Sequence, residues 1–225
     1  MRRLFTWGNK RPRRLCFAVG LYTAGYFIFD HAYAPIVHNS RSPLDIKSRY
    51  GKGSWAVISG ATDPLGVDMA NHLASKGFKL YLLDTNRAEL DKLASNLALK
   101  TEVKSKEFDF LKVDSHEPYE SLCKSIHEEC GDISMLVNNV ERRDPLVDRF
   151  HDTSDEDLIK LLNVNSFPIT FLTRFLGPGM KKRDKKCAIV NMTGSYSVYP
   201  SPYLPVYSAS KGFQQALSEC LGFEN

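Results

Sequence analysis

From residue 55 onward, the chain alternates short apolar runs with longer segments of helical spacing. This alternation is typical of parallel strands joined by crossover helices. The apolar runs predict strands at 55–59, 79–83, 103–110, 133–137 and 187–192. The intervening and following segments predict helices at 66–76, 87–97, 119–129, 155–175 and 207–221. The sequence therefore predicts an α/β fold with a doubly wound parallel sheet.

Residues 1–34 precede this pattern and differ from it in composition. Six basic residues come before the first acidic residue, Asp30, and an uncharged apolar run fills positions 15–29. As a helix, this run would span about 22 Å, which is less than the hydrocarbon core of about 30 Å. The basic flank and the interfacial aromatic residues favour a hydrophobic membrane-anchor helix. A cleaved signal peptide, a mitochondrial presequence and a buried core helix are the alternatives.

Residues 35–53 predict a linker, because Pro35, Pro43, Gly51 and Gly53 lie there among polar residues. Residues 54–225 then form one domain. The formal net charge is +4, and much of it lies in the basic N-terminal flank. The remaining body is therefore near neutral, and we expect no nucleic-acid partner. The five cysteines do not have the spacing of metal ligands, so no metal site is expected.

A glycine-containing turn, Ser-Gly-Ala-Thr-Asp-Pro-Leu-Gly at 59–66, follows the first predicted strand. Such a turn lets the backbone approach a pyrophosphate at a helix N-terminus, where the helix dipole favours an anion. Asp84 ends the second predicted strand and can accept hydrogen bonds from the ribose hydroxyls of an adenosine. This arrangement predicts a Rossmann-like dinucleotide site. Asp84 favours NAD over NADP, and Arg87, three residues later, would weaken that preference.

Tyr207 and Lys211 lie four residues apart in the last predicted helix, so they share one helix face. An ammonium beside a phenol stabilises the phenolate and lowers the tyrosine pKa from its usual value of about 10. Such a tyrosine can donate a proton to an alkoxide formed by hydride transfer. The pair therefore predicts acid–base chemistry beside a bound dinucleotide.

Five ordered segments together resemble the short-chain dehydrogenase/reductase superfamily. They are the turn at 59–66, Leu-Val-Asn-Asn-Val at 136–140, Asn-Val-Asn at 163–165, Ile-Val-Asn-Met-Thr at 189–193 and Tyr-Ser-Ala-Ser-Lys at 207–211. With Pro-Gly-Met at 178–180, the closest likeness is to the branch of 17β-hydroxysteroid dehydrogenases and very-long-chain 3-oxoacyl-CoA reductases. The resemblance covers about residues 50 to 221.

The resemblance implies an NAD(P)-dependent oxidoreductase. It would transfer a hydride between nicotinamide and a carbonyl or secondary alcohol of a lipid-like substrate, either a steroid or a 3-oxoacyl-CoA. It also implies a homodimer at the endoplasmic reticulum membrane, with the mitochondrion as the alternative location. The implied catalytic residues are Tyr207, Lys211, Asn165 and Ser195. The implied cofactor contacts are Gly60, Thr62, Asp63, Leu65, Gly66, Asp84, Asp109, Asn138 and Lys211.

Four features depart from the family pattern. Pro64 and Glu141 stand where the pattern has glycines, and Gly194 stands where it has the serine that polarises the carbonyl. A shift of one residue would bring Ser195 to that place. Family members also continue beyond Asn225, so the predicted fold is C-terminally incomplete. These departures favour an alternative function, a catalytically impaired relative that keeps the fold as a nucleotide- or partner-binding module.

Overall fold

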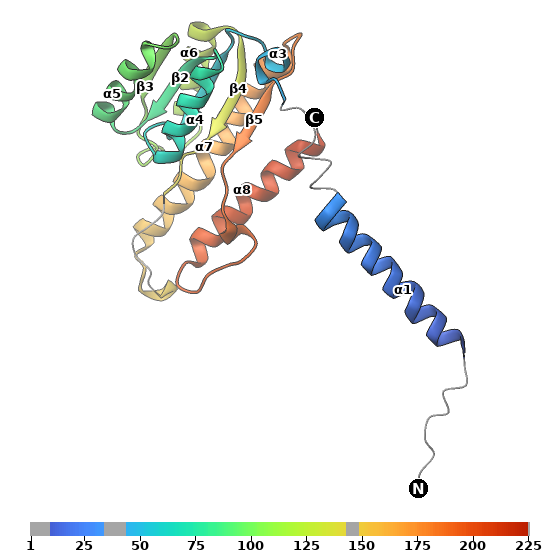
Figure 1. Ribbon diagram of the computed structural model, residues 1–225. Helices are drawn as coiled ribbons and strands as arrows, with labels where there is room; N and C mark the ends of the chain where they lie inside the picture. Colours follow the sequence, from blue (N-terminus) through green and yellow to red (C-terminus); the bar gives the residue numbers. More distant parts are fainter. Residues whose placement is uncertain (1–9, 34–43, 143–148, 225) are drawn as a thin grey trace. The chain divides into compact units, whose positions relative to one another are not determined.

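The computed structural model describes residues 10–33, 44–142 and 149–224 (Figure 1). Contacts divide the chain into two units, Met1–Leu44 and Asp45–Asn225. In the first unit, α1 (Lys10–Ile28) continues into a π-helical turn at Phe29–Tyr33. Apolar side chains such as Tyr22 and Ile28 are exposed on it. Among the described helices, none combines the length and apolar character needed to cross a membrane. The membrane anchor and the cellular location stay predictions.

The second unit contains one five-stranded parallel sheet with the order β3-β2-β1-β4-β5. Its strands are β1 (Trp55–Ser59), β2 (Lys79–Asp84), β3 (Val103–Glu107), β4 (Ile133–Asn138) and β5 (Ala188–Asn191). The long helices are α4 (Pro64–Ser75), α5 (Arg87–Ala98), α6 (Glu117–Cys130), α7 (Asp155–Lys181) and α8 (Pro205–Phe223). Three short helices complete the described part of the unit, α3 (Ile46–Tyr50), η2 (Phe150–Asp152) and η3 (Ser195–Ser197). The predicted α/β fold with a parallel sheet is confirmed.

Helices cover both faces of the sheet, so each face has its own core. Successive side chains of a strand point to opposite faces and therefore join different cores. In β1, Trp55 and Val57 join the core beneath α6 and α7. Ala56 and Ile58 join the opposite core, beneath α4 and α5. Every residue of β1 and β4 is buried, as expected for parallel strands with helices on both faces.

The winding direction reverses between β1 and β4. From β1 the chain passes outward to β2 and β3, and it then returns to the other side of β1 to form β4. Ser59 and Asn138 are paired in register at the ends of these two strands. The loops that follow β1 and β4 therefore leave the same edge of the sheet in different directions. In open α/β sheets, ligands bind in the crevice at this switch point.

Most predicted boundaries lie within two residues of the observed ones, and three differences are larger or change the element. Helix α7 continues six residues beyond the predicted end at residue 175, although Pro178 lies inside it. It continues because Leu176 and Met180 are buried in the core, which outweighs the poor helix propensity of the segment. Strand β3 ends at Glu107 rather than at residue 110. The predicted linker contains α3, whose first turn is capped by the side chain of Asp45.

Gly179 gives a direct test of the packing between α6 and α7. A Cβ atom at this position would lie 2.3 Å from Cε1 of His127, so the His127 ring would have to move. We expect Gly179→Ala to lower the free energy of unfolding by about 1–2 kcal/mol, because overpacking outweighs the helix propensity that alanine adds. Gly212 in α8 provides the control, because a Cβ atom there would meet no atom within 4 Å. Gly212→Ala should raise the free energy by up to about 1 kcal/mol, and urea denaturation measures both changes.

Candidate active site

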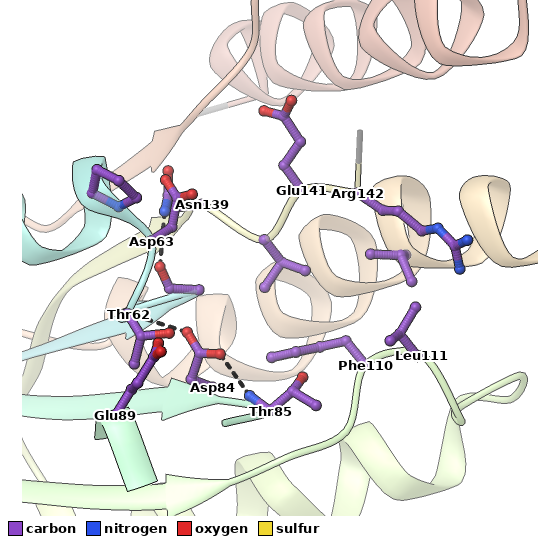
Figure 2. A pocket seen from close by; sticks show the side chains of 14 residues that line it. Thr62, Asp63, Asp84, Thr85, Glu89, Phe110, Leu111, Asn139, Glu141 and Arg142 are labelled. Atoms are coloured by element: carbon purple, nitrogen blue, oxygen red, sulfur yellow. Dashed lines mark hydrogen bonds between the residues drawn. The ribbon is translucent and has the colours of Figure 1, made fainter. Parts of the chain in front are cut away.

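A cleft of about 680 Å³ opens at the carboxyl ends of β1, β2 and β4 (Figure 2). The turn after β1 forms one wall, and the segment after β4 forms the other. Its lining residues are Gly60, Thr62, Asp63, Pro64, Asp84, Thr85, Glu89, Phe110, Leu111, Asn139, Val140, Glu141, Arg142 and Val164. The cleft therefore occupies the switch point of the sheet, where a doubly wound fold binds its ligand.

The turn after β1 is a close contact between backbone segments. Gly60 has a φ of +66°, a conformation that glycine adopts at little cost. A Cβ atom on Gly60 would lie 2.9 Å from the carbonyl oxygen of Asn139. The Asn139 amide in turn donates to the Gly60 carbonyl at 2.9 Å, which ties the end of β4 to the turn. Pro64, which stands where the family pattern has a glycine, is the first residue of α4. At that position its missing N–H does not cost a helical hydrogen bond.

Asp84 connects the turn to the end of β2. Its Oδ2 accepts a hydrogen bond from the Thr62 backbone N–H at 2.8 Å, and its Oδ1 accepts one from Thr85 N–H at 2.7 Å. An ionised carboxylate has about four acceptor positions on its two oxygens, so capacity for further donors remains. Asp84 therefore orders the turn and also presents negative charge to the cleft, together with Asp63 and Glu89.

Tyr207 and Lys211 lie together on one face of α8, as the sequence predicts. They are 2% and 1% exposed, and the Lys211 Nζ lies 5.6 Å from the centre of the Tyr207 ring. A buried ammonium needs hydrogen-bond partners, because desolvation of an unpaired charge is costly. Gln214, one helical turn further, accepts a hydrogen bond from Lys211 Nζ at 3.1 Å. Its own amide donates to the backbone carbonyl of Asn165 at 2.7 Å.

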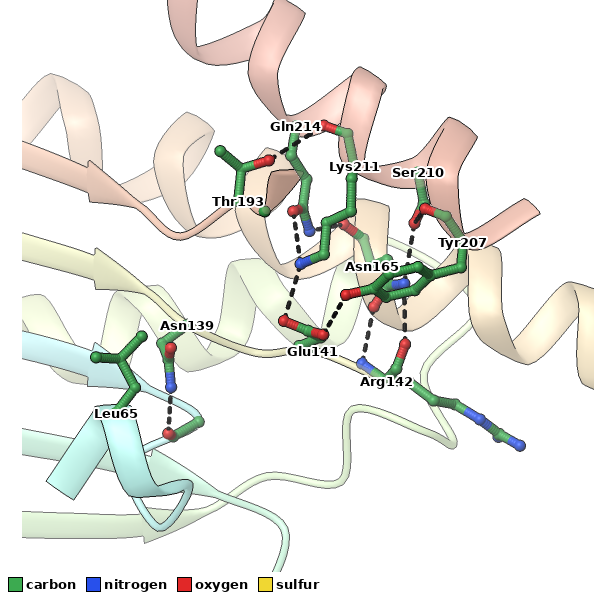
Figure 3. Close-up of polar contacts among 12 residues, drawn as sticks. Leu65, Asn139, Glu141, Arg142, Asn165, Thr193, Tyr207, Ser210, Lys211 and Gln214 are labelled. Atoms are coloured by element: carbon green, nitrogen blue, oxygen red, sulfur yellow. Dashed lines mark hydrogen bonds and ion pairs between the residues drawn. The ribbon is translucent and has the colours of Figure 1, made fainter. Parts of the chain in front are cut away.

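Glu141 joins the two functional groups of the pair (Figure 3). Its Oε1 accepts the hydrogen bond of the Tyr207 hydroxyl at 2.5 Å, and its Oε2 pairs with Lys211 Nζ at 3.0 Å. Sequence analysis identified Glu141 only as a departure from a glycine of the family pattern. It did not predict that the carboxylate contacts Tyr207 and Lys211. Since Glu141 also lines the cleft, its carboxylate lies between the cleft and the pair.

Asn165 of α7 is fully buried and organises the segment after β4. Its Oδ1 accepts from the backbone N–H of Arg142 at 2.8 Å, and its Nδ2 donates to the Arg142 carbonyl at 3.1 Å. The same Nδ2 donates to Ser210 Oγ of α8 at 3.0 Å. The side chain of Arg142 pairs with Asp157 at 3.2 Å. Asn165 thus connects α7, α8 and the residue that follows Glu141, and sequence reasoning missed Ser210, Gln214 and Asp157 in this network.

Eight predicted site residues lie outside the cleft lining: Tyr207, Lys211 and Asn165 of the cluster described above, Gly66 in the first turn of α4, and four others. Asp109 accepts from Leu111 N–H at 3.0 Å and pairs with Lys112, while Phe110 and Leu111 line the cleft. Leu65 is 43% exposed. Asn138 is buried beneath the sheet edge, where its amide donates to the side chains of Asn191 and Thr173. Ser195 is exposed in η3, while its neighbour Tyr196 packs edge-on against the Tyr207 ring at 5.5 Å. The roles of these four residues stay predictions.

Known proteins are similar to this chain in both sequence and fold. The short chain dehydrogenase family model matches residues 54–225. The very-long-chain 3-oxoacyl-CoA reductase of Podospora anserina is 39% identical over 181 residues, which are 78% of this chain and 52% of the relative. The reductase of that name from Bos taurus is 34% identical over 173 residues, or 75% and 54%. The structure of NAD⁺-bound xylitol dehydrogenase has a TM-score of 0.70 and 25% identity, and the match covers 77% of this chain and 65% of that chain.

The order of the strands, the switch-point cleft and the tyrosine–lysine pair together define a doubly wound α/β protein with a buried tyrosine–lysine–glutamate cluster beside its cleft. The chain belongs to the short-chain dehydrogenase family, whose model matches most of its length. The predicted resemblance to the very-long-chain 3-oxoacyl-CoA reductase branch is confirmed. The chain spans about half the length of the curated relatives it matches.

Proposed function

We propose that this chain carries the nucleotide-binding and acid–base residues of an NAD(P)-dependent reductase that acts on the keto group of a long-chain 3-oxoacyl-CoA. The observation that carries the proposal is the convergence of the Tyr207 hydroxyl and the Lys211 ammonium on the carboxylate of Glu141, a residue that lines the cleft at the switch point of the sheet. The substrate class comes from the names of the relatives in Podospora anserina and Bos taurus. A homodimer stays a prediction.

The residues around the cleft fit the adenosine half of a nicotinamide dinucleotide. At Gly60 the wall is bare backbone, and the cleft is also lined by Thr62 of the turn, Asp63 at the N-cap of α4 and Pro64, the first residue of α4. This is the arrangement in which a helix N-terminus binds a phosphate anion. Gly60 and Gly66 would line the pyrophosphate, and Asp84 would hold the adenosine ribose. When bound, the nicotinamide supplies the hydride.

The protein's contribution to the reaction is a proton and its placement. Tyr207 would donate its hydroxyl proton to the oxygen of the reduced carbonyl, since a positioned phenol can act as a general acid. Lys211 would stabilise the phenolate that remains after this transfer. Gln214 and Asn165 hold the ammonium and the adjoining backbone in place through their hydrogen bonds.

The carboxylates of the cleft predict a preference for NADH over NADPH. Asp84, Asp63 and Glu89 would all repel the additional phosphate of NADPH. In a fluorescence titration, we expect NADH to bind at least roughly tenfold more tightly, the ratio that about 1.4 kcal/mol of repulsion produces. Asp84→Asn should narrow this ratio, whereas the control Glu128→Gln, on an exposed carboxylate of α6 outside the cleft lining, should not. Tighter binding of NADPH would contradict the assignment of Asp84.

The same titration, followed by a reductase assay with a long-chain 3-oxoacyl-CoA, tests the proposed function. Saturable NADH binding with oxidation of NADH by the acyl-CoA would support it. Saturable binding without turnover would favour the alternative function, a nucleotide-binding module that keeps the fold. Failure to bind either nucleotide would reject the proposed function and would leave the partner-binding form of the alternative.

A further inference from the structure

Glu141 engages the whole acid–base pair with one carboxylate. The Tyr207 hydroxyl and the Lys211 ammonium each contact a different oxygen of it (Figure 3). The side chain of Glu141 is 30% exposed, whereas that of Lys211 is 1% exposed. The carboxylate is thus the solvent-facing member of a cluster whose other members are buried.

The ordinary acidities of the two groups place the shared proton on Tyr207, because a glutamic acid has a pKa of about 4.3 and a tyrosine one of about 10. An ionised carboxylate can only accept hydrogen bonds, so the proton between Glu141 and Tyr207 belongs to the tyrosine. A phenolate at the same place would face the carboxylate with no proton between the two negative groups. Glu141 therefore stabilises the neutral phenol relative to the phenolate.

The ion pair with Lys211 strengthens this effect. A lone ammonium beside Tyr207 would favour the phenolate, but here the ammonium is paired with Glu141 at 3.0 Å. Removal of the carboxylate charge would therefore lower the pKa of Tyr207 in two ways. It would remove the repulsion that disfavours the phenolate, and it would leave the positive charge of Lys211 uncompensated beside the phenol.

Further polar groups around this cluster belong to the segment after β4 and to α7, α8 and η3. Arg142, on the segment after β4, pairs with Asp157 of α7 at 3.2 Å. Ser210 of α8 is neutral and donates to the Tyr207 backbone carbonyl at 2.7 Å. Tyr196 of η3 contributes the edge-on ring contact. In this cluster, the charges of Glu141 and Lys211 have opposite effects on the Tyr207 phenol. A substitution of Glu141 by the neutral residue glutamine changes that balance by one charge.

We propose that Glu141 is a positioning residue that keeps Tyr207 protonated, and so holds the site in the form that donates a proton to a carbonyl rather than the form that accepts one from an alcohol. The link to reduction rests on the proposed function. The effect of Glu141 on the protonation of Tyr207 is a property of the protein alone, and it can be measured without nucleotide or substrate.

The test is an ultraviolet titration of tyrosinate absorbance on the full chain. The chain has ten tyrosines, so the signal of Tyr207 is obtained as the difference between the chain and its Tyr207→Phe variant. The same difference is measured in the Glu141→Gln background, because glutamine keeps an acceptor oxygen but removes the charge. We expect the Tyr207 midpoint to fall by at least about one pH unit in Glu141→Gln. Glu89→Gln is the matched control, since Glu89 lines the same cleft from α5, and it should leave the midpoint unchanged.

An unchanged Tyr207 midpoint in Glu141→Gln would overturn the proposal, as would an equal fall in Glu89→Gln. If Glu141→Gln does not fold, Glu141→Ser tests the loss of the same charge. Lys211→Met supplies a second test of the balance, because loss of the cation should raise the midpoint. A fall of the midpoint in a chain that binds no NADH would reject the proposed function while it supports the role of Glu141. In an active preparation, Glu141→Gln should extend alcohol oxidation to lower pH.

Discussion

Tyr207→Phe is expected to lower kcat/KM for carbonyl reduction by roughly 10²- to 10⁴-fold, the range that one general acid contributes. The variant removes the hydroxyl that would donate the proton, and the ring stays packed against Tyr196. Lys211 keeps its bonds to Glu141 and Gln214, so the buried ammonium remains paired. NADH affinity should therefore change little, because Tyr207 does not line the cleft. Steady-state kinetics and a fluorescence titration measure the two quantities separately.

Tyr196→Phe is the matched control for this prediction. Tyr196 is the partner of the Tyr207 ring in the edge-on contact, and the substitution removes a hydroxyl from the same aromatic pair. Its kcat/KM should stay close to that of the unchanged chain. A Tyr207→Phe variant with normal turnover would show that another group donates the proton. An equal loss in both variants would point to packing of the aromatic pair rather than to proton transfer.

The pattern of residues predicted the pair, because Tyr207 and Lys211 are neighbours on one helix and their spacing alone fixes their common face. The contact with Glu141 could not be predicted in this way, since 66 positions separate Glu141 from Tyr207 and only the tertiary fold brings them together. Gln214 could have been found, because it lies three residues after Lys211 and thus on the same helix face. Residue spacing within one helix therefore predicted which side chains share a face. Contacts between a loop and a helix could not be predicted from spacing.

The fold was predictable where the hydrophobic pattern of a segment is clear. Strand β1 matches its predicted range, because its continuous apolar run is short and bounded by polar residues. The end of α7 was not predictable from Gly177, Pro178 and Gly179, because burial of Met180 decides it. The resemblance implies that Asp109 contacts the cofactor, and the structure places it in the loop after β3, where its carboxylate accepts from Leu111 N–H and pairs with Lys112. Its contact with the cofactor stays a prediction.

The second large effect is expected at Gly66, in the first turn of α4. A Cβ atom there would lie 2.2 Å from the carbonyl oxygen of Gly60 and 3.0 Å from Cα of Ala61. Both neighbours are backbone atoms of the turn, so relief of the clash requires the turn and the helix N-terminus to separate. We expect Gly66→Ala to lower the free energy of unfolding by about 1–3 kcal/mol or more, the cost of forced overpacking.

The same displacement should reduce NADH affinity more than stability alone would suggest. The turn carries Thr62, whose backbone N–H is held by Asp84, and both residues line the cleft. Movement of α4 away from Gly60 would widen the site in which the helix N-terminus is expected to meet the pyrophosphate. Asp68→Ala, on the exposed face of the same helix, is the control, and it should stay within about 0.5 kcal/mol of the unchanged chain. If Gly66→Ala is as stable as Asp68→Ala and binds NADH equally well, the close approach of α4 to the turn does not determine the nucleotide site.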